Sequence, residues 1–395
     1  MKRQLAFGLF ILMFVSLACR VSLTPTPPPG TPLPPTATIT LTPTPTETPT
    51  PTPTSTPPLT ANGPALIELH MFTTLRGWGL TEDQILITHS SGIDWVQVPL
   101  PGITFGPSVS SYFVNADIAY FLVPIPDKQI SQLFNTRDGG ATWQTTAAPF
   151  GSAKLYFPDD NTGFALQTIK TDNNLMSVAI YQTLDRGVTW TQVFIHAANA
   201  DDKNLPIAGI KTGMSFIDPS QGFIGLQAQE NSVGLYHAQD AGRTWTKEEI
   251  SVPDDLGGTY QSTVLPPFFF YGNTLDGVLP VDFQTADSDA TTRVFYTTHD
   301  AGVTWQKGGE IQDCTAYFFA DAQTGWAWGG QAIYATTDGA NTWQKIPAAF
   351  NHSERARLID FVNRQDGWLL TIDGKNVLRM YQTDDGGTTW IAIIS

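Results

Sequence analysis

Apolar and polar residues alternate in short runs along most of the chain, and the runs end at glycine, aspartate or asparagine. The C-terminal segment shows four such runs, Ala356–Val362, Gly367–Ile372, Asn376–Thr383 and Thr389–Ile394. Alternation with a period of two, bounded by turn residues, predicts half-buried β-strands joined by hairpins. No segment has a convincing helical period, so the pattern predicts an all-β chain.

An eight-residue motif, Thr-x-Asp-x-Gly-x-Thr-Trp, joins the third run to the fourth, and we call it the octet. Its tryptophan can be followed through seven copies: Trp95, Trp143, Trp190, Trp245, Trp305, Trp343 and Trp390. Six copies keep the aspartate: Asp138, Asp185, Asp240, Asp300, Asp338 and Asp385. Successive tryptophans lie between 38 residues (Trp305 to Trp343) and 60 residues (Trp245 to Trp305) apart.

A second motif, glycine followed by an apolar residue after a turn, precedes the octets. It reads "DAQTGWAW" around Trp326 and "NRQDGWLL" around Trp368, and it weakens to "NADIAYFL" around Tyr120. Each repeat has room for four short strands, here called A to D. Two motifs in step over seven units predict a seven-bladed β-propeller of four-stranded antiparallel blades, closed by blade 1 covering blade 7.

In this fold the octet is the hairpin between strands C and D. The aspartate can accept hydrogen bonds from turn amides, the glycine supplies a positive φ, and the tryptophan adds a large apolar plate. We interpret the octets as structural because several copies depart from the pattern, with Ser90 in place of aspartate and Ala340 in place of glycine. A repeated structural element tolerates such losses, whereas one catalytic centre would not.

The octet resembles the Asp-box, or bacterial neuraminidase repeat, of sialidases, sortilin-type receptors, xyloglucanases and photosystem II stability/assembly factors. The two motifs together are most similar to the last family, over Leu66 to Ser395. This resemblance implies a seven-bladed propeller, lipid-anchored in some members, that serves as an assembly factor. It also implies an arginine-rich binding surface, from which the acidic composition of this chain departs.

The N-terminus indicates export. Lys2 and Arg3 precede an apolar run and the small-residue sequence "SLAC", which predicts a signal peptide over residues 1–18, of the lipoprotein type with lipid on Cys19. A soluble secreted protein with an unmodified cysteine is the alternative. A linker over 19–62, almost wholly threonine and proline, cannot build a core and predicts a disordered stalk before a propeller over 63–395. We therefore expect a membrane-anchored protein facing outside, or a secreted one.

Charge narrows the class of partner. Of 21 basic residues, Lys2, Arg3 and Arg20 precede the propeller, and of 36 acidic residues only Glu47 does, which leaves the propeller a net charge of −17. Such a domain repels phosphate, so we expect no nucleic-acid partner and membrane contact through the lipid anchor alone. Besides Cys19 the chain has only Cys314, so no disulfide framework is predicted. We also expect the protein to be a monomer and to bind no cofactor.

Catalytic motifs are weak. A sialidase requires three converging arginines, a tyrosine–glutamate pair and the sequence Arg-Ile-Pro, and that sequence is absent. Glycoside hydrolysis needs two carboxylates flanking one bond, and no spacing selects such a pair. The histidines show no metal-ligand spacing, so no metal site is predicted. A glycoside hydrolase of the sialidase or xyloglucanase propeller type remains the alternative to a non-catalytic binding module.

Loop lengths predict where a ligand binds. In an up-and-down meander the A–B and C–D turns share one face, and the B–C and D–A connections share the other. The long connections, Phe194–Lys211, Lys247–Ser262, Lys170–Leu175 and Phe283–Thr292, all belong to the second set, on blades 3 to 5. We expect a protein or glycan to bind there, near acidic loop residues that could also contribute to calcium binding: Asp201, Asp202, Asp254, Asp255, Asp287 and Asp289.

Overall fold

The computed structural model describes residues 59–60, 63–196, 204–228, 230–254, 256–270, 272–347, 350 and 354–394. The expected signal peptide, Cys19 and nearly all of the stalk lie outside these residues. Within them the secondary structure consists of strands alone, and no described helix has the length and apolarity to cross a membrane. The prediction of an all-β chain is confirmed.

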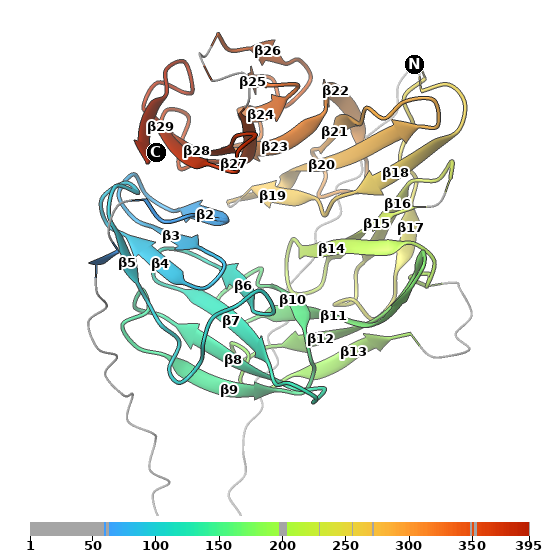
Figure 1. Cartoon of the computed structure of the whole chain (residues 1–395). Coiled ribbons are helices and arrows are strands. Elements are labelled where there is room, and N and C mark those ends of the chain that lie inside the picture. Colours follow the sequence, from blue (N-terminus) through green and yellow to red (C-terminus); the bar gives the residue numbers. More distant parts are fainter. Residues whose placement is uncertain are drawn as a thin grey trace, which may run out of the picture. The chain divides into compact units, whose positions relative to one another are not determined.

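The strands form successive four-stranded antiparallel blades arranged in a ring (Figure 1). Blade 1 is β2 (Glu68–Met71), β3 (Gly77–Leu80), β4 (Ile85–Thr88) and β5 (Trp95–Gln97). Blade 2 is β6 (Ser110–Phe113), β7 (Ala119–Pro124), β8 (Ser131–Thr136) and β9 (Gln144–Ala148). Blade 3 is β10 (Ala153–Tyr156), β11 (Gly163–Asp172), β12 (Leu175–Thr183) and β13 (Thr191–Ile195).

Blade 4 is β14 (Ile210–Phe216), β15 (Gly222–Gln227), β16 (Gly234–Ala238) and β17 (Thr246–Glu248). In blade 5 the first strand is divided into β18 (Tyr260–Val264) and β19 (Phe268–Phe270), followed by β20 (Asn273–Thr285), β21 (Thr292–Thr298) and β22 (Gln306–Gln312). Blade 6 is β23 (Cys314–Phe319), β24 (Gly325–Gly329), β25 (Ala332–Thr336) and β26 (Gln344–Lys345). Blade 7 is β27 (Arg355–Phe361), β28 (Gly367–Ile372), β29 (Leu378–Thr383) and β30 (Ile391–Ile394).

Seven blades occupy six hydrogen-bonded sheets, because blades 4 and 5 share one nine-stranded sheet. The link is the pairing of β15 with β18 at Gln227 and Thr263, supported by the Ala228 N–H donating to the Ser262 carbonyl at 2.9 Å. Each half of that sheet keeps the A-to-D order of the other blades. The predicted seven-bladed propeller is therefore confirmed.

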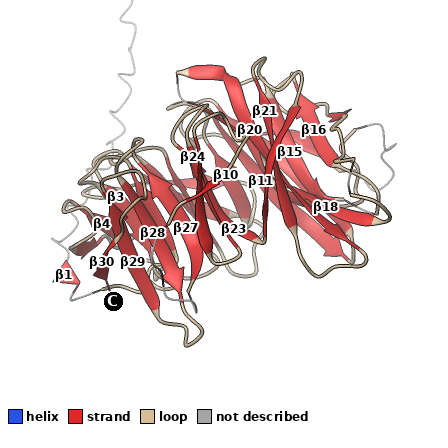
Figure 2. Ribbon diagram, turned by 90° about the horizontal axis from the view of Figure 1, so that it is seen from above, coloured by secondary structure: helices blue, strands red, loops and turns tan. Residues whose placement is uncertain are grey.

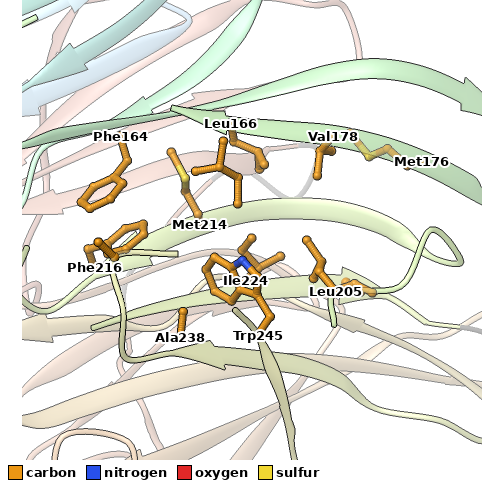
Figure 3. Close-up of a cluster of buried hydrophobic side chains, with 13 residues drawn as sticks. Phe164, Leu166, Met176, Val178, Leu205, Met214, Phe216, Ile224, Ala238 and Trp245 are labelled. Carbon is orange, nitrogen blue, oxygen red and sulfur yellow. The ribbon is translucent and has the colours of Figure 1, made fainter. Parts of the chain in front are cut away.

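The seams between blades are built by the second motif. The apolar residue of strand B is buried and meets a ring at the end of strand A in the next blade, in five near-equivalent contacts: Trp78–Phe113, Tyr120–Phe157, Phe164–Phe216, Phe223–Phe269 and Trp326–Phe361. Figure 3 shows one such seam, where Phe164 lies over Phe216 above a cluster that includes Ile224 and Trp245.

The glycine of the second motif makes room for the same rings. Gly367 pairs directly with Phe361, and a Cβ on Gly367 would lie 2.3 Å from that ring. Gly222 stands in the same relation to Phe216, and a Cβ on Gly163 would lie 2.3 Å from the Phe157 ring. A ring at the end of strand A therefore fills the space above a glycine in its own blade and packs on strand B of the preceding blade.

Blade 7 meets blade 1 through side chains and not through a shared strand. Trp368 and Leu370 pack with Leu69 and Met71 in one buried cluster, and the Trp368 indole donates to the Ser91 carbonyl at 2.9 Å. The expected cover of blade 7 by blade 1 is thus present. One boundary changes: β1 (Leu59–Thr60), in the expected stalk, pairs with β5, so the paired part of the chain begins before residue 63.

The octets and the A–B turns lie on one face of the ring, which we call the octet face, and the B–C and D–A connections form the opposite loop face. Figure 2 shows the strands running between these two faces. In every blade the N–H of the fourth octet residue donates to a carbonyl of the A–B hairpin, at 2.8 to 3.1 Å: Ser91 to Leu75, Gly139 to Asp117, Arg186 to Asn161, Ala241 to Ser220, Ala301 to Leu275, Gly339 to Gln323 and Gly386 to Gln365. The two hairpins of a blade are therefore tied together on this face.

Long connections do lie on the loop face, but their predicted confinement to blades 3 to 5 is wrong. Val98–Val109 joins blade 1 to blade 2 without a strand of its own. Lys170–Leu175 is no loop, because β11 and β12 pair as far as Asp172 and Leu175 and turn tightly at Asn173 and Asn174. The residues of that hairpin are mostly polar, so the sequence indicated a loop where β11 and β12 in fact continue beyond the core of the blade.

Candidate functional site

The octet carboxylates are engaged in their own turns. In all six aspartate-bearing octets one oxygen accepts the N–H of the second octet threonine at 2.8 to 2.9 Å and the other accepts its hydroxyl at 2.6 to 2.7 Å. These bonds hold the pKa of the carboxyl low; at Asp300 the Thr304 hydroxyl is the largest cause. The six sit in six different blades, so they do not converge on one substrate.

A cavity of about 640 Å³ lies on the octet face near the centre of the ring. Rings from four blades line it, among them Tyr112, Tyr156 and Phe269. Two of its polar groups already have partners: Tyr112 Oη donates to the Phe157 carbonyl at 3.1 Å, and Asp160 binds Arg137 at 2.8 Å. Burial raises the pKa of Tyr112 far above its usual value, so this phenol stays neutral.

A hollow of about 410 Å³ lies on the loop face between blades 2, 3 and 4, and we call it the lysine hollow. It is lined by Lys128, Lys154 and Lys211, together with Gln129 and Gln167. Lys128 and Lys154 are exposed. Lys154 Nζ donates to the Thr212 carbonyl at 2.5 Å, across from blade 3 to blade 4.

Lys211 is the buried member of the lysine hollow, with 2% of its surface exposed. Its Nζ lies 2.5 to 3.1 Å from four backbone carbonyl oxygens, those of Met176, Pro206, Ile207 and Gly209, which share its three N–H donors. Burial lowers the pKa of Lys211 to about 8, because the charged form loses hydration. Among the described residues no carboxylate pairs with it, and the dipoles of these carbonyls stabilise its charge.

The acidic loop residues predicted to mark a binding surface are dispersed. Asp201, Asp202 and Asp255 lie outside the described residues. Asp254, Asp287 and Asp289 are exposed. Asp289 lines a separate hollow of about 390 Å³ on the loop face, with Glu230 and Tyr260 among its neighbours. Within the described part of the chain, no three potential ligands of the His, Cys, Asp or Glu type come together for a metal ion.

Blade 7 contains a tyrosine–glutamate pair of the kind that a sialidase requires. Tyr381 Oη lies 3.1 and 3.0 Å from the two Glu354 oxygens, and Arg379 Nη1 lies 3.4 Å from Oε1. Burial, with the hydrogen bond and charge of Glu354, raises the pKa of Tyr381 to about 12. A nucleophile needs the opposite shift, so this geometry makes Tyr381 a neutral donor that satisfies a buried carboxylate.

The arginines do not converge either. Four of them bind single carboxylates at separate places around the ring, in the pairs Arg76–Asp117, Arg137–Asp160, Arg293–Asp282 and Arg364–Asp321, and Arg379 binds both Glu354 and Asp373. Arg293 is the most enclosed, with two parallel bonds to Asp282 at 2.6 and 2.7 Å. These arginines are thus engaged with acidic partners at separate places instead of converging on one carboxylate substrate.

These features define the class: a seven-bladed β-propeller with octet hairpins on one face and ligand-sized hollows on both. Among solved structures the chain is similar to YCF48 from Cyanidioschyzon merolae, with 17% identity and a TM-score of 0.55 over 82% of this chain and 97% of that one. It is similar to YCF48 bound to a D1 peptide, with 15% identity and a TM-score of 0.51 over 85% of this chain and 99% of that one.

The chain is also similar to an oligogalacturonate lyase from Vibrio parahaemolyticus, with 10% identity and a TM-score of 0.56 over 84% of this chain and 92% of that one. No family model and no curated protein matches the sequence. The resemblance to the photosystem II assembly factor YCF48 is confirmed for the fold. An assembly factor and a lyase share this scaffold, so the fold alone does not select a function.

The lysine hollow was missed in the sequence. Its lysines come from three different blades and share no sequence motif, so their spacing in the chain does not predict that they lie together. One signal was available: Lys154 and Lys211 interrupt apolar runs, "SAKLYF" and "AGIKTGMSF", that form the innermost strands of blades 3 and 4. A cation on an innermost strand either faces the central axis or is buried between blades.

Proposed function

We propose that this chain is a non-catalytic binding or assembly module, displayed at a bacterial cell surface by a lipid on Cys19, and that it binds a protein or glycan through the loop face. One observation carries the proposal. The turns of the octet face are short and hydrogen-bonded to one another, whereas the loop face carries the long connections, with hollows of about 410 and 390 Å³ beside them. The cavity on the octet face is lined by these short turns and not by long connections. Variable loops on a rigid scaffold are the usual place for ligand binding.

The experiment is capture of partners from the native envelope by the full-length anchored chain. We expect replacement of Asp254–Gly258 by two glycines to reduce recovery of the captured partner at least tenfold. The comparison variant changes the octet face, where Leu184 and Val303 are 66% and 62% exposed. Leu184→Ser with Val303→Ser should leave recovery unchanged. Loss of the partner in the octet-face variant, with full recovery in the loop variant, would refute the proposal.

A glycoside hydrolase is the second candidate, and the observation in its favour is the Tyr381–Glu354 pair. The raised pKa of Tyr381 opposes a nucleophilic role. An assay with a panel of chromogenic glycosides distinguishes a binding module from a glycoside hydrolase. We expect the full chain to hydrolyse none of them. Turnover that Tyr381→Phe abolishes would replace the binding proposal with the enzymatic one.

A further inference from the structure

The lysine hollow is an electropositive place on an acidic domain. Its lining holds three lysines and no carboxylate, although the sequence has 36 acidic residues against 21 basic ones. Like charges placed together repel one another unless an anion joins them. A concentration of cations in a concave site, where field lines are focused, therefore indicates a negatively charged ligand.

The hollow also presents neutral hydrogen-bonding groups. A Cβ placed on Gly151 would lie 3.6 Å from both Gln129 Oε1 and Gln167 Nε2, so two amides converge on this glycine. The Ser131 hydroxyl donates to the Gly151 carbonyl at 3.0 Å and fixes that turn. Amides donate and accept at once, which suits hydroxyl groups, whereas ammonium groups suit a carboxylate.

The cationic end of the hollow is held in place before any ligand arrives. Four carbonyls fix the Lys211 ammonium, and the Thr212 carbonyl orients Lys154 from the neighbouring blade. Thr212 is held in turn by its hydroxyl, which donates to the Val264 carbonyl of blade 5 at 2.6 Å. A preorganised site loses less conformational entropy on binding.

We propose that the lysine hollow binds a small ligand that carries both a carboxylate and hydroxyl groups, an acid sugar in chemical class. Lys128 and Lys154 contact the carboxylate, Lys211 supplies positive charge from beneath, and the amides of Gln129 and Gln167 contact hydroxyls. The volume of about 410 Å³ falls within the range of small-molecule pockets, roughly 300 to 1,000 Å³. The inference deepens the proposed function and rests on it, since it names a ligand for one hollow of the loop face.

The test is calorimetric titration of the full chain with D-glucuronate, D-glucose, glutamate and inorganic phosphate. We expect saturable binding of glucuronate and at least tenfold weaker binding of the other three. Lys128→Gln with Lys154→Gln should weaken glucuronate binding at least tenfold, and raised salt should weaken it in the unchanged chain. The matched control is Lys375→Gln, an exposed lysine of blade 7 on the same face, which should have no effect.

A second variant fills the hollow without changing charge. Gly151 has an ordinary backbone conformation, and no atom lies within 3.4 Å of an added Cβ, so Gly151→Leu should fold and abolish glucuronate binding. Glucose binding as tightly as glucuronate, unchanged binding in the lysine variant, or no saturation by glucuronate would overturn the inference. Phosphate binding as tightly would overturn the acid-sugar assignment. The capture experiment tests the proposed function separately. If capture of the envelope partner still depends on Asp254–Gly258, the proposed function holds even where the acid-sugar inference fails.

Discussion

The fourth octet residue has a left-handed backbone in every copy, with φ between 60° and 71°. Glycine was expected to supply the positive φ at the fifth position, but the fourth position needs it as well and is glycine in only three copies: Gly139, Gly339 and Gly386. Its N–H reaches the A–B turn only in this conformation, so the octet joins two hairpins besides closing one. A non-glycine residue there carries a conformational penalty of roughly 1–2 kcal/mol.

The penalty can be measured at Ala301, whose φ is 60°. Ala301→Gly should raise the free energy of unfolding by about 0.5–1 kcal/mol, because relief of the left-handed strain exceeds the added entropy of the unfolded chain. Urea denaturation checks this. Ala141→Gly, at an exposed octet position without a positive φ, should instead lower the stability by a similar amount. Equal effects of the two substitutions would contradict the explanation.

One octet has alanine instead of glycine at the fifth position, and a strand of the preceding blade lies close to its backbone. Ala340 is buried with a φ of 66°, and the strand β22 of blade 5 approaches it through Gly308 and Gly309. A Cβ on Gly309 would lie 2.9 Å from the Ala340 carbonyl. Glycine has a low strand propensity, but two adjacent glycines in β22 allow its backbone to approach the backbone at Ala340 closely.

Between elements, stability resides in the rings that pass from strand A of one blade to strand B of the preceding blade. The Trp326–Phe361 and Phe164–Phe216 pairs are the closest of these contacts, each with ring centroids 3.5 Å apart and with planes 4° and 3° from parallel. The second motif is therefore an inter-blade contact motif, with its glycine and its apolar residue serving the same ring from two sides.

Phe361→Ala should lower the free energy of unfolding by about 3–5 kcal/mol, because it removes a buried ring and leaves a cavity between blades 6 and 7. The measurement is thermal or urea denaturation followed by tryptophan fluorescence. Leu184→Ala, on the exposed octet face, should change the stability by less than about 0.5 kcal/mol. A small effect of Phe361→Ala would mean that the seam is not a main source of stability.

For the whole molecule, a buried carboxylate lies where the ring closes. Asp360 of blade 7 is 7% exposed and accepts the Met71 N–H of blade 1 at 2.5 Å. Burial raises the pKa of Asp360 to about 6, opposed by the hydrogen bond from Met71 and the nearby His70. Because this pKa lies above the ordinary value of 3.8, protonation favours the folded ring.

The stability contributed by Asp360 is fully present below about pH 4 and is lost as the pH rises through 6. Asp360→Asn keeps an acceptor for Met71 and removes the charge, so at pH 7.5 it should raise the free energy of unfolding by about 1–3 kcal/mol. The difference from the unchanged chain should shrink towards pH 4. Denaturation at several pH values measures it, with the exposed Asp384→Asn as control. A difference independent of pH would contradict the assignment.

Much of the fold was predictable because the alternation of apolar and polar residues and the turn residues are local signals, each contained within a few positions of the sequence. In blade 7 the predicted run Gly367–Ile372 coincides with β28, and the other runs differ from β27, β29 and β30 by no more than two residues at either end. Lys170–Leu175 failed for the same local reason, since its polar residues indicate a loop although its backbone continues the pairing of β11 and β12. The lysine hollow was not predicted because its residues come from three blades and no spacing in the sequence connects them.

The sequence by itself determined the repeating unit, the number of blades and the face on which each turn lies, because these follow from periodicity and from turn residues within one repeat. Only the tertiary structure decided how blade 1 meets blade 7, which carboxylates and arginines are already paired, and where three lysines gather. Those features depend on contacts between residues far apart in the chain, such as the Met71 backbone N–H with the Asp360 carboxylate, and local spacing cannot predict such contacts.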